Sequence, residues 1–500
     1  MKKLVYSLTK NVPYQWGGRT RSILMRIHSL NATDQFEAYI VSFQYKRFLK
    51  RVNEDFIQKG YIDRAEQHIN LFANIQGETT HFDNYMEVLK QYPLKKFHKK
   101  VVRKEGKVTS IQYTEKKEPK LALMYKNTIL DSIRFYEDGW IKYKGFIDEY
   151  GNISVVFEYE KDATEPSRLY YLDDQLRPYV IYRQTITKTG KIKIQEIFWF
   201  TEGKRQRFTL ERDFIAALFD KYLSKDACWI CDDRKLDDST CLFDVDRYYV
   251  MHSSHRKDQS DVLTVKAQYK RLFLRVEAYG GEIISLTRQQ KEDILKLYPL
   301  LENHIHVISH YADEKTKAST EDEVKPYFLI AARICPQKQI EDSIQAFALA
   351  QEELPGYTLE IYGEGTEEKQ LKQWVKEEGI KRVHFHPFTN KVDELMNHAA
   401  AYLCTSKYEG FSLSINEALN NGCPVVSYDI PYGPNDMVEE GENGLLVPNH
   451  DIKTFAKKMV EIVHLEKEHQ LWTRDKIQRV EQEKYGLPAY VQKWKDLLLK

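Results

Sequence analysis

The chain of 500 residues is long enough for two or three domains, each with its own hydrophobic core. Its 75 Lys and Arg nearly balance its 74 Asp and Glu, which argues against a general nucleic-acid binder and against a disordered acidic protein. No apolar run approaches the ~20 residues of a membrane span, and the first apolar run is too short to predict a signal peptide. Six cysteines do not suggest a disulfide framework, so we expect a cytoplasmic protein.

The N-terminal segment has the pattern that opens a nucleotide-binding fold. Residues 3–8 are predicted as a strand, and residues 23–30 have apolar side chains at helical spacing. Between them lies a loop that contains Gly17, Gly18 and Arg19. Strand, glycine loop and helix in this order are typical of Rossmann-like domains, although an ordinary tight turn fits two glycines equally well. The polar residues 55–77 are predicted to be helical.

Residues 84–209 break this α/β rhythm. Runs rich in β-branched and aromatic residues, such as 153–159 and 191–200, are separated by turn signals. These signals are Asp138-Gly139, Gly151-Asn152, Asp173-Asp174, Thr189-Gly190 and Glu202-Gly203. We therefore expect a meander of antiparallel strands inserted into the first domain.

The α/β pattern then resumes. A helix is predicted at 210–223 and a short buried strand at 227–231. Another strand begins at residue 247 and leads into His252 and His255. Residues that contact ligands in parallel sheets lie at the carboxyl ends of strands, so the two histidines are candidates.

A zinc site is an alternative use of the same histidines. Cys228 and Cys231 have the two-residue spacing of zinc ligands, and His252 and His255 could complete the set. However, the spacer between the histidines is shorter than the usual three to five residues. Cys228 and Cys231 would also face opposite sides of a strand.

The rest of the chain up to residue 325 alternates in the same way. Strands are expected at 281–286 and 305–308, and Thr287 with Gln290 predicts a capping box, in which each side chain bonds to the other residue's amide. The charged stretch 312–323 is predicted as an interdomain linker. The apolar positions of 490–499 predict an amphipathic helix at the far end.

The stretch 405–419 is the centre of the second domain. It places Glu409 and Glu417 with seven residues between them, after a buried apolar run and before a helical pattern. Gly410 lets the backbone come close to a ligand, and Ser412 and Ser414 are good N-cap residues. Loop amides and a helix N-terminus together favour an anion such as a phosphate. Carboxylates on both sides of it could bind hydroxyls, which is what a nucleotide-sugar needs.

Motifs on either side of this stretch make it specific. A strand from residue 328 ends in Arg333 and Lys338, and a strand from residue 359 ends in Gly363 and Gly365. The glycine- and proline-rich stretch 422–447 follows. This order and spacing, over roughly residues 325–450, resembles the retaining glycosyltransferases with two Rossmann-like domains. The layout of the whole chain resembles the wall teichoic acid α-glycosyltransferases, which carry a sheet insert in their N-terminal domain; some assemble as trimers through it.

The resemblance implies an α/β fold with two Rossmann-like domains facing a central cleft (GT-B) and a β-rich antiparallel insert in the N-terminal domain. The implied bounds are 1–83 and 210–311 for the acceptor domain, 84–209 for the insert, 325–485 for the nucleotide-sugar domain and 486–500 for a C-terminal helix packed back on the first domain. The insert would be a structural appendage, a subunit contact or a surface for a long acceptor.

The resemblance also implies roles for single residues. Arg333 and Lys338 would neutralise the donor diphosphate in place of a metal and stabilise the charge on the leaving phosphate. Glu409 would hold the sugar hydroxyls, Glu417 the ribose hydroxyls, and His252 would point at the sugar. The other implied donor-binding residues are Gly17, Gly18, Gly363, Glu364, Gly365, Tyr408, Gly410, Phe411, Ser412 and Leu413. Arg19 and His255 are expected to contact the acceptor.

The function that the resemblance implies is transfer of glucose or N-acetylglucosamine from a UDP-sugar to a polyol-phosphate polymer, with retention of configuration and without a metal or other cofactor. We expect a homotrimer, at most peripheral contact with a membrane-linked acceptor, and no nucleic-acid partner. The alternatives are an enzyme that glycosylates Ser/Thr-rich secreted adhesins and a non-catalytic glycan-binding subunit. Asp244 and Asp246 could instead be the metal-binding pair of the other large glycosyltransferase class, which lacks the Arg/Lys and Glu/Glu set.

Overall fold

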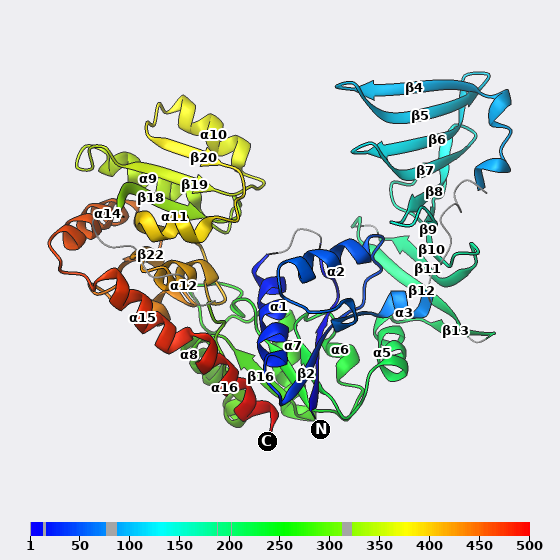
Figure 1. Ribbon diagram of the computed structural model, residues 1–500. Helices are drawn as coiled ribbons and strands as arrows, with labels where there is room; N and C mark the ends of the chain where they lie inside the picture. The colour runs from blue at the N-terminus through cyan, green and yellow to red at the C-terminus, as the bar shows by residue number, and fades with distance from the viewer. Residues whose placement is uncertain (1, 14–16, 77–87, 188, 202, 313–322) are drawn as a thin grey trace. The chain divides into compact units, whose positions relative to one another are not determined.

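A computed structural model describes residues 2–13, 17–76, 88–187, 189–201, 203–312 and 323–500 (Figure 1). By its contacts the chain divides into two compact units, 1–245 and 246–500. Residues 246–311 thus cluster with the second unit, whereas the sequence assigned them to the first domain. The predicted domain bounds stay a prediction. Within the described residues, no helix has both the length and the apolar character needed to cross a membrane.

The first unit contains a small parallel sheet that matches the predicted nucleotide-binding fold. Its strands lie in the order β14-β1-β2-β3, and α1 and α5 are its longest helices. The bounds are β1 (Lys3–Thr9), α1 (Gly18–Asn31), β2 (Phe36–Ser42), β3 (His68–Asn70), α5 (Glu211–Tyr222), β14 (Cys228–Cys231) and α6 (Asp237–Thr240). All four residues of β14 are buried, which fits the continuous apolar run of a parallel strand covered on both faces.

The prediction of one helix over 55–77 is wrong. The segment instead ends one helix, adds a sheet strand and starts another helix: α2 (Leu49–Gln58), η1 (Ala65–Gln67), β3 and α3 (Leu71–Gln76). His68 on β3 is 4% exposed and bonds to Ser42 Oγ at 2.8 Å and Asn53 Oδ1 at 2.7 Å. Burial lowers the pKa of His68 to about 3, so the imidazole is neutral. These polar residues are buried with partners, so their polarity does not indicate an exposed helix.

The insert is a ten-stranded antiparallel meander in which every strand pairs with its neighbours in sequence (Figure 1). Its strands are β4 (His98–Lys104), β5 (Lys107–Glu115), β6 (Glu118–Lys126), β7 (Ile129–Glu137), β8 (Trp140–Ile147), β9 (Ile153–Glu158), β10 (Arg168–Leu172), β11 (Pro178–Ile186), β12 (Ile192–Thr201) and β13 (Lys204–Phe208). The predicted antiparallel insert is thus confirmed. Its turn signals fall between strands, except that Glu202 lies outside the described residues.

The predicted turn signals leave out the β4–β5 turn, Glu105-Gly106, and two further hairpins whose turns lack glycine. Lys116 and Lys117 connect β5 to β6, and Asn127 and Thr128 connect β6 to β7. All four have positive φ, between 48° and 72°. Two consecutive residues with positive φ make the turn type that suits the twist of a hairpin, which glycine and asparagine normally supply. Lysine and threonine give no such signal in the sequence.

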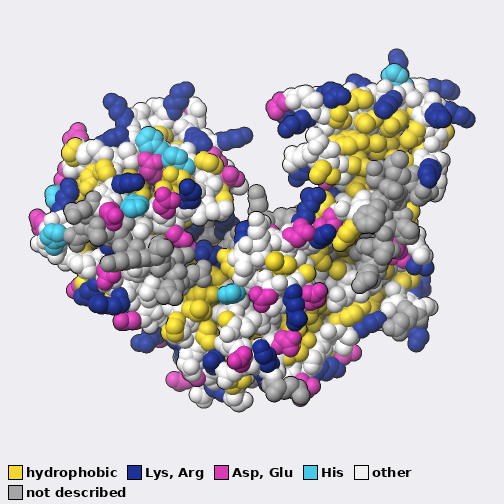
Figure 2. All heavy atoms as spheres, viewed as in Figure 1, with side chains coloured by type: hydrophobic (Ala, Val, Ile, Leu, Met, Phe, Trp, Pro, Cys, Tyr) yellow, Lys and Arg dark blue, Asp and Glu magenta, His cyan; other side chains and the backbone are white. Residues whose placement is uncertain are grey.

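One face of the insert sheet carries its own hydrophobic core. Side chains from β5 to β9 pack there against apolar residues of the segment 88–97, including Leu89 and Phe97. Hydrophobic side chains gather on the viewed face of the insert in Figure 2. Val101 on β4 and Ile129 on β7 stay 43% and 52% exposed. The insert therefore keeps apolar surface at its edge and turns.

The second unit begins with three parallel strands in the order β17-β16-β15. Its elements up to residue 307 are β15 (Arg247–Val250), α7 (Ala267–Tyr279), β16 (Glu282–Ser285), α8 (Arg288–Leu297), η3 (Pro299–His304) and β17 (Ile305–Val307). Thr287 caps α8 by accepting a hydrogen bond from the amide of Gln290 at 3.1 Å. The Gln290 side chain does not complete the predicted capping box, because it donates to the carbonyl of Ser253.

A six-stranded parallel sheet forms the rest of the second unit, with strand order β20-β19-β18-β21-β22-β23. The strands are β18 (Lys325–Ala331), β19 (Thr358–Tyr362), β20 (Val383–His386), β21 (Ala399–Cys404), β22 (Val425–Asp429) and β23 (Gly444–Pro448). The helices are α9 (Ile340–Ala350), α10 (Glu368–Glu377), α11 (Val392–His398), α12 (Leu413–Asn420), α13 (Pro434–Met437), α14 (Ile452–Lys467), α15 (Arg474–Tyr485) and α16 (Leu487–Leu498). The predicted linker falls mostly on 313–322, outside the described residues.

The C-terminal helix α16 buries one face, as its amphipathic pattern predicts. Tyr490 and Trp494 are 5% and 1% exposed. The ring of Tyr490 lies 4.8 Å from that of Tyr311, which follows β17. The helix therefore contacts the part of the chain that precedes the six-stranded sheet.

Candidate active site

The candidate site lies where β18 and β21 end side by side. These neighbouring parallel strands are connected to β19 and β22, which lie on opposite sides of them, so the strand order reverses between β18 and β21. Ligands of open parallel sheets bind at such a point, outside the carboxyl ends of the strands. The loops after the two strands, 332–339 and 405–412, are joined by hydrogen bonds. The Lys407 amide donates to the Gln337 carbonyl at 2.8 Å, and the Gln337 side chain donates to the Tyr408 carbonyl at 3.0 Å.

An ion pair between Lys338 and Glu409 connects these loops. Lys338 Nζ lies 2.7 Å from Glu409 Oε1, and the two side chains are only 17% and 11% exposed. Burial alone would lower the pKa of Lys338, but the attraction and hydrogen bond of Glu409, together with the nearby Cys404 and Tyr402, hold the pKa above its usual value. Lys338 is therefore charged. An ammonium has three N–H donors, so its bond to Glu409 leaves two for another anion.

Arg333 has a different environment from Lys338. Its side chain is exposed on the loop directly after β18. Among the residues that the structure describes, it makes no ion pair and no side-chain hydrogen bond. Arg333 is thus a permanent positive charge available at the strand end, whereas Lys338 is already held by a carboxylate.

The glycines of the site are explained by close contact between backbones. A Cβ on Gly363 would lie 2.0 Å from the Ala332 carbonyl oxygen, and one on Gly365 would lie 2.0 Å from that of Ile334. The Ile334 amide also donates to the Glu364 carbonyl at 3.0 Å. These glycines therefore allow the loop that carries Arg333 to lie directly on the loop after β19. The Glu364 side chain is exposed.

Gly410 also lies directly against another backbone segment. The sequence predicted instead that this glycine lets the backbone approach a ligand. A Cβ there would lie 2.4 Å from the carbonyl oxygen of His252. Gly433, after β22, likewise brings the backbone against the Phe411 carbonyl oxygen, at 2.0 Å from a Cβ. Neighbouring backbones thus hold the Glu409 loop on two sides.

The N-terminus of α12 follows this loop. Ser412 is its N-cap residue, with φ of 67°, but its side chain makes no capping bond, and its buried Oγ finds no hydrogen-bond partner among the residues that the structure describes. The expected N-cap position is right and the expected capping bond is wrong, because the left-handed backbone at Ser412 aims the hydroxyl elsewhere. Leu413 and Ser414 open the helix, where the first amides have no intrahelical acceptor. Glu417 lies in the second turn and is half-buried.

His252, predicted to face the sugar, lies beside this loop. It follows β15 and stacks on His310 with ring centroids 5.6 Å apart. His310 in turn contacts the Phe411 ring edge-on at 5.7 Å. Lys266 lies over the Tyr408 ring, with its Nζ 5.0 Å from the ring centroid. Neither His310 nor Lys266 was a sequence candidate. His310 follows β17, so the rule on strand ends could have found it, whereas nothing in the sequence marks Lys266.

His255 is placed differently from expectation. It is 0% exposed and stacks on Tyr432 at 5.7 Å, and burial lowers its pKa to about 4. Complete burial conflicts with the predicted contact to an acceptor. His255 belongs instead to a buried cluster in which Arg256 forms an ion pair with Asp293 and both bond to the Tyr432 hydroxyl at 3.0 Å. This cluster fixes the loop after β22.

The predicted residues of the glycine loop near the N-terminus lie in the first unit. Gly17 is the N-cap residue of α1, which begins at Gly18. Arg19 is 42% exposed and forms an ion pair with Asp233 at 3.4 Å. Asp233 follows β14, so this pair connects the first turn of α1 to the end of β14. That Gly17 and Gly18 bind the donor and Arg19 the acceptor stays a prediction.

The metal alternatives find little support in the arrangement of side chains. In the described part of the chain, no group of three or more His, Cys, Asp and Glu residues could hold a metal ion. Cys228 and Cys231 are buried and form no disulfide within the described residues. Asp244 and Asp246 are exposed and precede β15, at the opposite end of the strand from the one where ligands of parallel sheets bind.

A family model, two related enzymes and one solved structure are similar to this chain and agree with the geometry of the site. Residues 312–479 match the family model of glycosyl transferases group 1. Poly(glycerol-phosphate) alpha-glucosyltransferase of Bacillus subtilis is 25% identical over 98% of this chain and 74% of its own length. Poly(ribitol-phosphate) alpha-N-acetylglucosaminyltransferase of Staphylococcus aureus is 24% identical over 99% of both chains. The crystal structure of S. aureus TarM with fondaparinux, alpha-GlcNAc-glycerol and UDP matches over 100% of both chains, with a TM-score of 0.86 and 21% identity, which shows the fold.

The matched segment contains the loops after β18, β19 and β21, where Arg333, Lys338 and Glu409 lie. The structural match extends over the parallel sheets and the antiparallel insert alike. The chain therefore carries a group 1 glycosyltransferase domain and has the GT-B fold with an antiparallel sheet insert.

Proposed function

We propose that this protein is a retaining α-glycosyltransferase that moves glucose or N-acetylglucosamine from a UDP-sugar to a polyol-phosphate polymer. The observation that carries the proposal is the exposed Arg333 on the same loop as the Lys338 of the Lys338–Glu409 pair, after the strand where the strand order reverses. Two cations and a carboxylate there suit a diphosphate attached to a sugar. The similarity of nearly the whole chain to two enzymes named for glycosylating polyol phosphates supports the same substrates.

Each residue has a role in this proposal. Arg333 and Lys338 bind the donor diphosphate and stabilise the negative charge that grows on the leaving phosphate, where fixed charges contribute most to rate. Glu409 accepts hydrogen bonds from sugar hydroxyls while it holds Lys338 in position. Glu417 binds the ribose hydroxyls, and His252 faces the sugar.

Phosphate binding is assigned to the backbone as well. The first amides of α12, from Leu413 onwards, point out of the helix end and favour an anion. Gly363 and Gly365 act indirectly, because they hold the Arg333 loop rather than leave space at the nucleotide.

The reaction breaks the bond between the anomeric carbon and the leaving phosphate oxygen and forms a bond from that carbon to an acceptor hydroxyl on the same face. The leaving phosphate takes the hydroxyl proton, so no enzyme nucleophile is needed. Arg333 and Lys338 supply the positive charge that a divalent metal supplies in other transferases, and we propose that the reaction is independent of metal.

The setting of the reaction is proposed on the same basis. A cytoplasmic location agrees with the donor and with six cysteines that form no disulfide within the described residues. We propose a homotrimer that contacts the membrane only through a membrane-linked acceptor. No nucleic-acid partner is expected.

The test is transfer by the purified protein from UDP-glucose and from UDP-N-acetylglucosamine to three acceptors: poly(glycerol phosphate), poly(ribitol phosphate) and a Ser/Thr-rich peptide. We expect one donor to be favoured, polyol phosphate to be glycosylated, and NMR to show an α linkage. Transfer to the peptide alone would favour the adhesin-modifying enzyme. Binding of glycans without donor hydrolysis would favour a non-catalytic subunit.

A further inference from the structure

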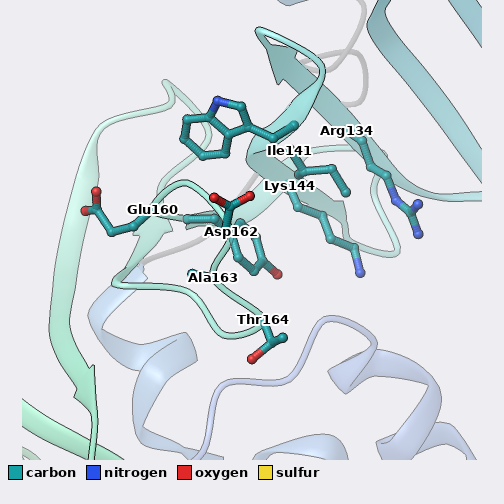
Figure 3. Close-up of a pocket in the computed structure, with 9 residues that line it drawn as sticks. Arg134, Ile141, Lys144, Glu160, Asp162, Ala163 and Thr164 are labelled. Carbon is teal, nitrogen blue, oxygen red and sulfur yellow. The ribbon is translucent and has the colours of Figure 1, made fainter.

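A cavity of about 320 Å³ lies in the insert sheet. It is formed by β7, β8 and the loop after β9, and Figure 3 shows its side chains. The lining residues are Arg134, Trp140, Ile141, Lys144, Tyr159, Glu160, Asp162, Ala163 and Thr164. The group 1 domain does not include these residues.

Two cations face each other across the ladder that forms this cavity. Arg134 on β7 is directly opposite Lys144 on β8, and both are half-buried. Figure 3 shows the two side chains extending from neighbouring strands in the same direction. Like charges directly opposite in a sheet are destabilising. Burial and the charge of Arg134 lower the pKa of Lys144, and the attraction of Asp131 offsets this only in part.

No carboxylate in the described residues forms an ion pair with either cation. Neither Arg134 nor Lys144 forms an ion pair, and Arg134 Nε is buried without a hydrogen-bond partner. Asp131, the nearest acid on β7, is already paired with Arg47 at 2.8 Å. Two unneutralised, half-buried cations in one cavity are the donor set that an anion such as a phosphate needs.

The remaining lining groups suit hydroxyls better than further anions. Asp162 and Thr164 offer oxygen acceptors, and the rings of Trp140 and Tyr159 offer flat apolar surface. Asp162 makes no ion pair with the two cations among the described residues. Glu160 accepts a hydrogen bond from Ser167 Oγ at 3.1 Å, and Figure 3 shows it pointing away from Lys144. The cavity thus has a phosphate-binding side and a hydroxyl-binding side.

We propose that this cavity binds one polyol-phosphate repeat of the acceptor, with its phosphate on Arg134 and Lys144 and its hydroxyls on Asp162 and Thr164. This inference rests on the proposed acceptor and adds a second binding site for it, in the insert. A polymer held at one repeat is present at a high effective concentration at the catalytic site, provided that it spans both. A single repeat gains nothing from the second site.

The test removes both cations with the double substitution Arg134→Gln/Lys144→Gln. We expect the KM for long poly(glycerol phosphate) to rise by a factor of about 10 or more, because linked binding commonly contributes factors of 10² or above. The kinetics with single glycerol phosphate and the rate of donor hydrolysis should not change. Equal losses on long and short acceptors, or no loss on either, would overturn the proposal.

The matched control is Arg103→Gln/Lys126→Gln. These residues also lie on the insert sheet and are exposed, so the control removes the same two charges outside the cavity. It should leave the KM for the long polymer near the wild-type value. A similar rise in the control would mean that the general charge of the sheet attracts the polymer, without a specific site.

Thermal unfolding separates a binding role from a structural one. Because the two cations repel each other, the double variant should unfold at the wild-type temperature or above it. A clear fall in Tm would identify them as structural residues.

Two binding measurements by calorimetry test the hydroxyl side independently of catalysis. Wild type should bind a glycerol-phosphate oligomer more tightly than inorganic polyphosphate of equal charge, because polyphosphate brings no hydroxyls and meets the charge of Asp162. Asp162→Asn should reduce or reverse that preference. Equal binding of both polymers by wild type would contradict the hydroxyl part. If wild type glycosylates no polyol phosphate, the proposed function fails, and oligomer binding by wild type but not by the double variant would still establish the site.

Discussion

Replacement of Lys338 by alanine is expected to reduce both turnover and stability. The substitution leaves Glu409, which is 9% exposed, without its cation. Removing one partner of a buried ion pair costs about 3–5 kcal/mol of unfolding free energy. Since the side chains of the pair keep 17% and 11% exposure, we expect the lower end, about 3 kcal/mol. At ~2–4 °C per kcal/mol, this predicts a fall in Tm of about 6–12 °C.

In Lys338→Ala, turnover should fall by more than the loss of stability alone would cause. Loss of one group that stabilises a developing oxyanion costs a factor of about 10² to 10³ in kcat. Turnover is measured as UDP release with saturating acceptor, well below the Tm of the variant, and thermal unfolding is followed by circular dichroism.

The double variant Lys338→Met/Glu409→Gln separates the two effects. Replacing both charges by uncharged side chains of similar size removes the unpaired carboxylate, so Tm should recover most of the loss. Turnover should stay low. Near-normal turnover in either variant would refute the assignment of Lys338 to the donor site, and an unchanged Tm in Lys338→Ala would refute the contribution of the ion pair to stability.

Three further predictions follow from the same structure. Arg333→Ala should lower turnover by a factor of about 10² with an unchanged Tm, because Arg333 is exposed and stabilises a phosphate rather than the fold; normal turnover would remove it from the site. EDTA should leave activity largely intact, since Arg333 and Lys338 supply the positive charge, whereas strict dependence on added manganese or magnesium would favour Asp244 and Asp246. Light scattering should give the mass of a trimer that Val101→Glu, on the exposed edge strand β4, converts to monomer; a monomeric wild type would end this idea.

The parts of the fold that the sequence predicted well are those with a strong local pattern. The buried strand β14 and the amphipathic helix α16 have it, and both lie within a few residues of the predicted bounds. The strand β3 has no such local pattern, because its buried polar residues form hydrogen bonds with partners from distant segments. His68, for example, bonds to Asn53 and Ser42, and no pattern within a single segment records those contacts.

The site was predictable in its residues but not in their environments. Arg333 and Lys338 look equivalent in the sequence, as two cations after one strand. Only the fold shows that Lys338 meets Glu409, 71 residues further along, while Arg333 stays exposed. Gly410 was assigned to a ligand, yet the atom nearest to its missing Cβ belongs to the backbone of His252. His255 has the type and position of a binding residue, and its burial depends on Tyr432, far along the chain.

The sequential pairing of the insert has a consequence for the order in which the first unit folds. β1 pairs with β14, so Val5 can form its strand contacts only after Cys228 has been synthesised. Every strand of the meander, in contrast, pairs only with its neighbours in sequence. Local contacts form sooner than distant ones, and the meander ends at Phe208, before β14 begins. On the ribosome it can therefore be complete while the parallel sheet still lacks β14, the partner of β1. Halving the loop that joins β1 to β14 saves only about 0.6 kcal/mol, so a prefolded insert benefits the rate of assembly far more than the final stability.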